Sequence, residues 1–69
     1  MQLTIEYEQE EDGRWLAEVL ELPGTLAYGQ SPEEAVNKAK ALALRVIAEQ
    51  IEHGERDTRD LKTISFAAA

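Results

Sequence analysis

The sequence contains no cysteine, which excludes disulfide bonds, thiolate catalysis and cysteine-ligated zinc sites. His53 is the one histidine, so a histidine-rich metal cage is excluded as well. A chain of 69 residues forms a single domain and buries only about 60% of the surface that it exposes when unfolded. Domains this small usually gain stability from disulfides, a metal or self-association. Since the first two are excluded, we expect a homo-oligomer, either a dimer or a tetramer.

Long apolar runs are also missing. No stretch approaches the roughly 18 consecutive apolar residues of a membrane-spanning helix. The N-terminus alternates apolar and polar residues, whereas a secretory signal has a basic stretch followed by an apolar one. These features predict a cytoplasmic protein without membrane contacts, and nothing in the sequence calls for a cofactor.

Basic residues are scarce in the N-terminal half. Residues 1–34 carry nine acidic side chains and one basic side chain, Arg14, for a net charge of −8, whereas residues 35–69 carry +1. Such a surface repels nucleic-acid phosphates and attracts basic proteins. The charge therefore predicts no direct binding of nucleic acid. It leaves two interpretations open: a surface for a basic partner, or one that only keeps the protein dispersed.

The first third of the chain predicts a hairpin. Residues 3–8 alternate strictly between apolar and polar, Asp12-Gly13 is a turn signal, and residues 14–21 form the return strand. One face is expected to be the core: Leu3, Ile5, Tyr7, Trp15, Ala17 and Val19. For the two aromatic residues, anchoring of a partner is the alternative. Leu16 and Leu20 point to the opposite face and predict a second contact surface.

The middle of the chain predicts a third strand and a long helix. Pro23-Gly24 reverses the chain before a short strand at 25–28. Ser31 is an N-cap, and together with Glu34 it forms a capping box that starts a helix over 32–52. The helix ends at Gly54.

The helix is apolar on two sides. The wider arc is expected to pack on the sheet: Ala35, Val36, Ala39, Leu42, Ala43, Val46 and Ile47. Ala41, Leu44, Ala48 and Ile51 lie on the far side, beside a charged strip of Lys38, Arg45, Glu49 and Glu52. We therefore predict Leu44 and Ile51 as further oligomer contacts, the alternative being scattered surface residues.

A charged connection over 55–60 leads to a last strand at 61–66, and residues 67–69 are expected to be frayed. The order is β-β-β-α-β, which predicts an α+β fold: a three-stranded antiparallel meander, one added strand parallel to an earlier one, and a single helix on one face. The other face of the sheet is left uncovered in a monomer.

Three segments in this order resemble the HicB family of antitoxins. They are Gly13-Arg14-Trp15-Leu16-Ala17-Glu18-Val19, Glu21-Leu22-Pro23-Gly24, and Gly29-Gln30-Ser31-Pro32-Glu33-Glu34-Ala35. Leu20 and Thr25 differ from the family's commonest residues, which are proline and cysteine. The resemblance implies a degenerate ribonuclease-H-like domain over residues 1–69 without catalytic activity. It also implies a partner, a basic HicA-like ribonuclease toxin that cleaves mRNA and whose active surface the antitoxin covers.

Charge placement predicts where that partner binds: Glu6, Glu8, Glu10, Glu11, Asp12 and Glu18. Many HicB proteins continue into a DNA-binding domain, but the 15 residues after Gly54 are too few for one. Two alternatives stay open. Glu6, Glu8 and Glu18 could be metal ligands of an active hydrolase. The chain could also be an oligomeric adaptor or a small-ligand regulatory domain without a toxin partner.

Overall fold

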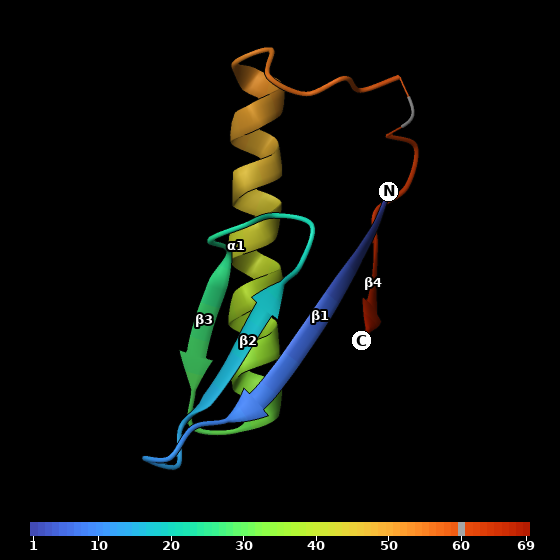
Figure 1. The fold of residues 1–69 in the computed structure, drawn as a ribbon. Helices are drawn as coiled ribbons and strands as arrows, with labels where there is room; N and C mark the ends of the chain where they lie inside the picture. Colours follow the sequence, from blue (N-terminus) through green and yellow to red (C-terminus); the bar gives the residue numbers. More distant parts are fainter. Residues whose placement is uncertain (60) are drawn as a thin grey trace.

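The computed structural model describes residues 1–59 and 61–69, so Asp60, at the end of the predicted charged connection, lies outside the described residues. The elements are β1 (Gln2–Gln9), β2 (Trp15–Val19), β3 (Leu26–Gly29), α1 (Pro32–Glu52) and β4 (Ser65–Ala68). The strands form one sheet in the order β3-β2-β1-β4, with β1, β2 and β3 antiparallel and β4 parallel to β1. Figure 1 shows α1 along one face of this sheet. The predicted α+β arrangement is confirmed.

The hairpin between β1 and β2 forms as its sequence predicts. Gly13 has a φ of 91° and donates its N–H to the Glu10 carbonyl at 3.0 Å. The Glu10 N–H in turn donates to the Arg14 carbonyl at 2.7 Å. The register places Ile5 opposite Val19, so the two strands share one apolar face.

The turn between β2 and β3 buries a leucine. Thr25 donates its N–H to the Leu22 carbonyl at 3.0 Å, and Gly24 has a φ of 85°. Proline at the second position and a positive φ at the third are the signature of a type II turn. This turn folds Leu22 back into the core, where 5% of it is exposed.

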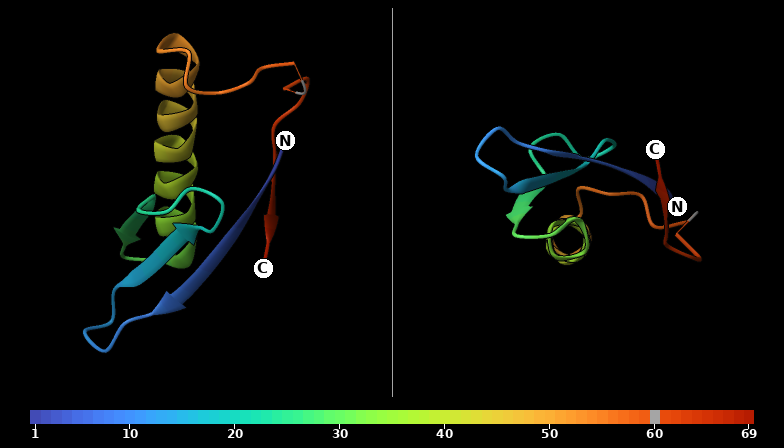
Figure 2. Two further views of the ribbon diagram at one scale, coloured as in Figure 1. Left: turned by 45° about the horizontal axis from the view of Figure 1, so that its top comes forward. Right: turned by 90° about the horizontal axis from the view of Figure 1, so that it is seen from below.

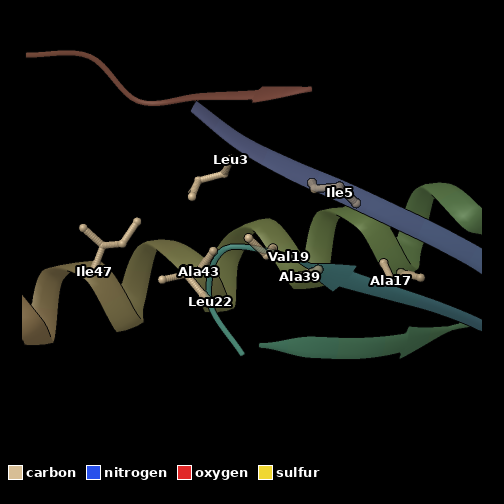
Figure 3. Packing of buried hydrophobic residues seen from close by; sticks show 9 residues of the cluster. Leu3, Ile5, Ala17, Val19, Leu22, Ala39, Ala43 and Ile47 are labelled. Carbon is tan, nitrogen blue, oxygen red and sulfur yellow. The ribbon is translucent and has the colours of Figure 1, made fainter. Parts of the chain in front are cut away.

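Small residues set the distance between α1 and the sheet. Ala35, Ala39, Ala43 and Ile47 recur every four residues on α1 and are buried. They pack with Leu3, Ile5, Ala17, Val19 and Leu22 (Figure 3). The approach is close at Gly29 of β3, where an added Cβ would lie 2.5 Å from the Ala35 backbone nitrogen.

Both ends of α1 are capped as predicted. The Ser31 hydroxyl accepts the Glu34 N–H at 3.1 Å, and the Glu34 carboxylate accepts the Gln30 N–H at 3.4 Å. At the other end, Gly54 has a φ of 69° and donates to the Ile51 carbonyl, while Glu55 donates to the Gln50 carbonyl. This pair of bonds is a Schellman motif, which satisfies the last carbonyls of the helix.

The last strand lies further along the chain than predicted. We expected it over 61–66, but β4 begins at Ser65, and Ala67 and Ala68, expected to be frayed, pair with Thr4 and Ile5. The hydrogen bonds between neighbouring strands are made by backbone groups, so the small side chains of Ala67 and Ala68 do not prevent pairing. The Ala69 N–H extends the ladder to the Ile5 carbonyl at 2.8 Å.

Tyr7 is not a core residue, contrary to the prediction. It lies on the helix side of β1, yet 49% of it is exposed, while its neighbour Trp15 is half-buried against the core. The two rings lie 6.3 Å apart. Figure 2 shows the reason, because α1 lies under β2 and β3 and leaves the β1–β4 side of the sheet open.

Gly29→Ala should destabilise the fold by about 1–3 kcal/mol, because the added methyl overlaps helix backbone that cannot move independently. Urea unfolding measures the loss. Gly54→Asn is the matched control, since Gly54 has open space around it and asparagine tolerates its φ of 69°. Equal stability of the two variants would contradict this account of the helix–sheet contact.

A carboxylate continues the hydrogen bonding between β1 and β2 beyond the end of β2. Glu21 accepts the Thr4 N–H and the Thr4 hydroxyl, both at 2.7 Å. These hydrogen bonds, the backbone one first, lower the pKa of Glu21 below its usual 4.5. A lowered pKa in the folded state means that the contact stabilises the fold above pH 4.5 and that this stability is lost as the pH falls through the folded pKa.

Glu21→Ala should therefore lower the free energy of unfolding at pH 7, and its difference from the unsubstituted protein should shrink as the medium is acidified below the usual glutamate pKa. Urea titrations at neutral and acidic pH measure both differences. A difference that stays constant with pH would show that the Glu21 charge does not contribute.

Candidate partner-binding surface

The face of the sheet that α1 does not cover, called here the outer face, follows from the strand register. On β1, β2 and β3 the side chains of even-numbered residues lie on it, and those of odd-numbered residues lie on the helix side. Its members on these strands are Gln2, Thr4, Glu6, Glu8, Leu16, Glu18, Leu26 and Tyr28. Leu20, whose N–H donates to the Thr4 carbonyl, continues the series.

Three of the predicted partner-binding carboxylates come together on the outer face. Glu6 lies directly opposite Glu18, and Glu8 lies two pairs further along, opposite Leu16. These residues line one shallow depression. None of the ion pairs formed within the described residues includes Glu6, Glu8 or Glu18. Like charges directly opposite on neighbouring strands destabilise a sheet, so this arrangement is not explained by the stability of the fold.

Apolar side chains surround these carboxylates. Leu20 is 44% exposed, and Leu26 and Tyr28 are each 39% exposed. The guanidinium of Arg14 lies 4.2 Å from the centre of the Tyr28 ring, a cation–π contact at one end of the face. Exposed apolar groups beside unpaired charges are typical of a protein-binding surface.

The sequence did not identify Leu26, Tyr28 and Arg14 as part of this surface. A signal was present: β3 alternates large Leu26 and Tyr28 with small Ala27 and Gly29. The small residues have to be those under the helix, because the close approach at Gly29 leaves no room for large ones.

The hairpin tip holds the other predicted partner-binding residues, Glu10, Glu11 and Asp12. Asp12 is already engaged, since its carboxylate accepts the Arg14 N–H at 3.0 Å and the Arg14 Nε at 2.7 Å. These bonds lower the pKa of Asp12. Glu10 and Glu11 make no ion pair within the described residues. At the tip, Glu10 and Glu11 are therefore the carboxylates that are available to a partner.

Leu16 and Leu20, predicted as oligomer contacts, share the outer face with Glu6, Glu8 and Glu18. In a symmetric dimer, a patch meets its own copy. Contact through the outer face would thus bring the carboxylates of one copy toward those of the other. Repulsion between them opposes self-association here and favours a basic partner.

Leu44 and Ile51, the other predicted oligomer contacts, lie on the side of α1 away from the sheet. They are 45% and 39% exposed. The structure therefore leaves both side chains free to contact another protein.

A further groove lies on the helix side of the sheet. Its lining residues are Ile5, Tyr7, Val36, Lys40, Phe66, Ala67 and Ala68. Lys40 lies over the Phe66 ring, with its Nζ 5.6 Å from the ring centre. Lys40 and the Tyr7 hydroxyl are the polar side-chain groups of this lining, whereas small-ligand sites usually combine an apolar wall with several convergent polar groups.

Within residues 1–59 and 61–69, no three acidic, histidine or cysteine side chains lie close enough together to hold a metal ion. Over the same residues, α1 is not long and apolar enough to cross a membrane. The chain matched no protein-family model, no curated protein and no solved structure.

Glu18→Lys should raise the stability of the isolated domain by about 0.2–1 kcal/mol, because it turns the repulsion with Glu6 into attraction across the strands. Urea unfolding at low salt measures the gain, and high salt should reduce it by screening. A loss of stability at low salt would show that Glu18 has a structural role on the outer face.

Proposed function

We propose that this chain is the antitoxin of a type II toxin–antitoxin pair, a HicB-like protein of the cytoplasm. It binds a basic, HicA-like ribonuclease toxin and neutralises it by covering the surface that cleaves mRNA. It acts as a binding protein and not as an enzyme, through contact between proteins and without binding nucleic acid.

One observation carries this proposal: the outer face places Glu6 directly opposite Glu18, and no ion pair among the described residues includes either carboxylate. A cationic side chain of a partner would relieve that repulsion on binding. The exposed Leu20, Leu26 and Tyr28 beside them supply apolar area that a purely electrostatic contact lacks. The resemblance of three sequence segments to HicB antitoxins supports a HicA-like toxin as the partner.

The first experiment is co-expression with the product of a neighbouring gene for a short, basic protein. We expect a complex that survives purification and an mRNA-cleaving activity of the neighbour that disappears in the complex. No such gene, or a product that does not bind, would contradict the proposal.

Glu18→Lys should slow association with the toxin about tenfold, because steering by the outer face depends on its charge. Stopped-flow mixing at several salt concentrations measures the rate. Glu55→Lys is the matched control, since it changes the net charge equally but lies after α1, away from the outer face. If both variants slow association equally, net charge and not the outer face steers the toxin.

The second candidate function is an oligomeric adaptor without a toxin partner. The exposure of Leu44 and Ile51 on α1 favours it, because both side chains are available for self-association. An adaptor predicts self-association without a basic binding partner. Co-expression therefore separates the two functions.

A further inference from the structure

The outward side of α1 carries an apolar stripe with coiled-coil spacing. Ala41, Leu44, Ala48 and Ile51 follow one another at intervals of three, four and three residues. They lie opposite the buried row that includes Ala39 and Ala43, since each residue turns a helix by about 100°. This spacing is that of the a and d positions through which two helices pack together.

The second half of the stripe lies on the part of α1 that follows its last buried residue, Ile47. In Figure 1, β2 and β3 run beside the first turns of the helix, and its last turns continue beyond them. The buried residues of α1 end at Ile47, whereas Ile51 is 39% exposed. Half of the stripe thus belongs to a helical segment with little support from its own domain.

We propose that the occupant of this stripe is a second copy of the chain, whose α1 packs antiparallel to the first across a twofold axis. Antiparallel packing pairs a positions with d positions. Ala41 then faces Ile51 of the second copy, and Leu44 faces Ala48. Each layer combines one large and one small side chain, so the layers fill evenly.

The two ends of the charged strip beside the stripe are complementary to each other in the same arrangement. Lys38, Arg45 and Glu52 follow at intervals of seven residues and are e positions, whereas Glu49 lies further from the contact. Antiparallel pairing brings Lys38 beside Glu52 of the second copy at two symmetric places, and Arg45 lies beside its own copy once, at the twofold axis. Lys38, which already pairs with Glu34 at 3.1 Å in its own helix, would then lie between two carboxylates.

The parallel alternative is disfavoured by the same residues. In a parallel dimer each residue of the stripe would face the same residue of the second copy, so alanine would meet alanine, and leucine or isoleucine would meet its own kind. It would also place Lys40, at a g position, beside Arg45 of the other copy, at an e position, in two symmetric repulsive pairs. Size and charge therefore select the antiparallel dimer.

Self-association through α1 leaves the outer faces free. Each sheet lies on the side of its helix away from the dimer contact, so the two outer faces point in opposite directions. If the proposed function holds, one dimer carries two toxins. The dimer itself does not depend on that function, because its evidence lies entirely on α1.

Sedimentation of the purified full chain tests the proposal. The unsubstituted protein should be a dimer, and Leu44→Glu should weaken dimerisation on the order of a hundredfold, because each copy then places a carboxylate in an apolar layer. Circular dichroism checks the fold, which should persist because Leu44 is 45% exposed in the single domain. A monomeric unsubstituted protein, or a dimer that Leu44→Glu leaves intact, would overturn the proposal.

A charge exchange tests the antiparallel register. Lys38→Glu and Glu52→Lys should each weaken the homodimer about tenfold, since each sets like charges against each other at two symmetric places. A mixture of the two variants should restore dimerisation, because both contacts between positions 38 and 52 of unlike copies are then attractive. Failure of the mixture to form heterodimers would exclude this register.

Toxin binding separates this proposal from the proposed function. Leu44→Glu should give a monomer that still binds the toxin, whereas Glu18→Lys should remain a dimer that binds it more slowly. If the toxin does not bind at all while the unsubstituted chain dimerises, the proposed function fails and the dimer stands. If the toxin binds a chain that stays monomeric, the reverse holds.

Discussion

The contact between Gly29 and the first turn of α1 is the constraint on which the rest of the structure depends. A single methyl at Gly29 would lie 2.5 Å from the Ala35 backbone nitrogen, so β3 and the helix approach too closely there for a side chain. Alanines at 35, 39 and 43 continue the row of small buried residues along the helix. The large side chains of the core come mostly from the sheet and the turn after β2, as Leu3, Ile5 and Leu22 do.

A core with one helix leaves much apolar and charged surface outside it. α1 lies against β2 and β3, whereas the β1–β4 side of the sheet is left more open (Figure 2). Glu6 and Glu18 remain opposed on the uncovered face, where solvent screens their repulsion without removing it. A fold selected for stability alone would replace one of them, so the opposed pair is a cost in stability that the proposed binding of a basic partner would offset.

The sequence predicted those parts of the fold that depend on local rules. Ser31, Gly54 and the Asp12-Gly13 turn act through neighbouring backbone groups, and the helix and hairpin they bound were placed correctly. β4 was misplaced because its pairing with β1 depends on distant backbone groups, to which Ala67 and Ala68 contribute no pattern. Tyr7 was misjudged because periodicity gives the face of a residue but not the reach of the helix that covers it.

The candidate site shows the same division between local pattern and distant pairing. Alternation within β1 and β2 was enough to put Glu6, Glu8 and Glu18 on one face, but the register was needed to show that Glu6 directly opposes Glu18. The register also joins Tyr28 of β3 to Leu16 of β2, which turns an acidic patch into a mixed surface. Because repulsion opposes contact between two outer faces and the apolar stripe on α1 carries no such repulsion, the proposed partner binding and the proposed self-association would use different sides of the domain.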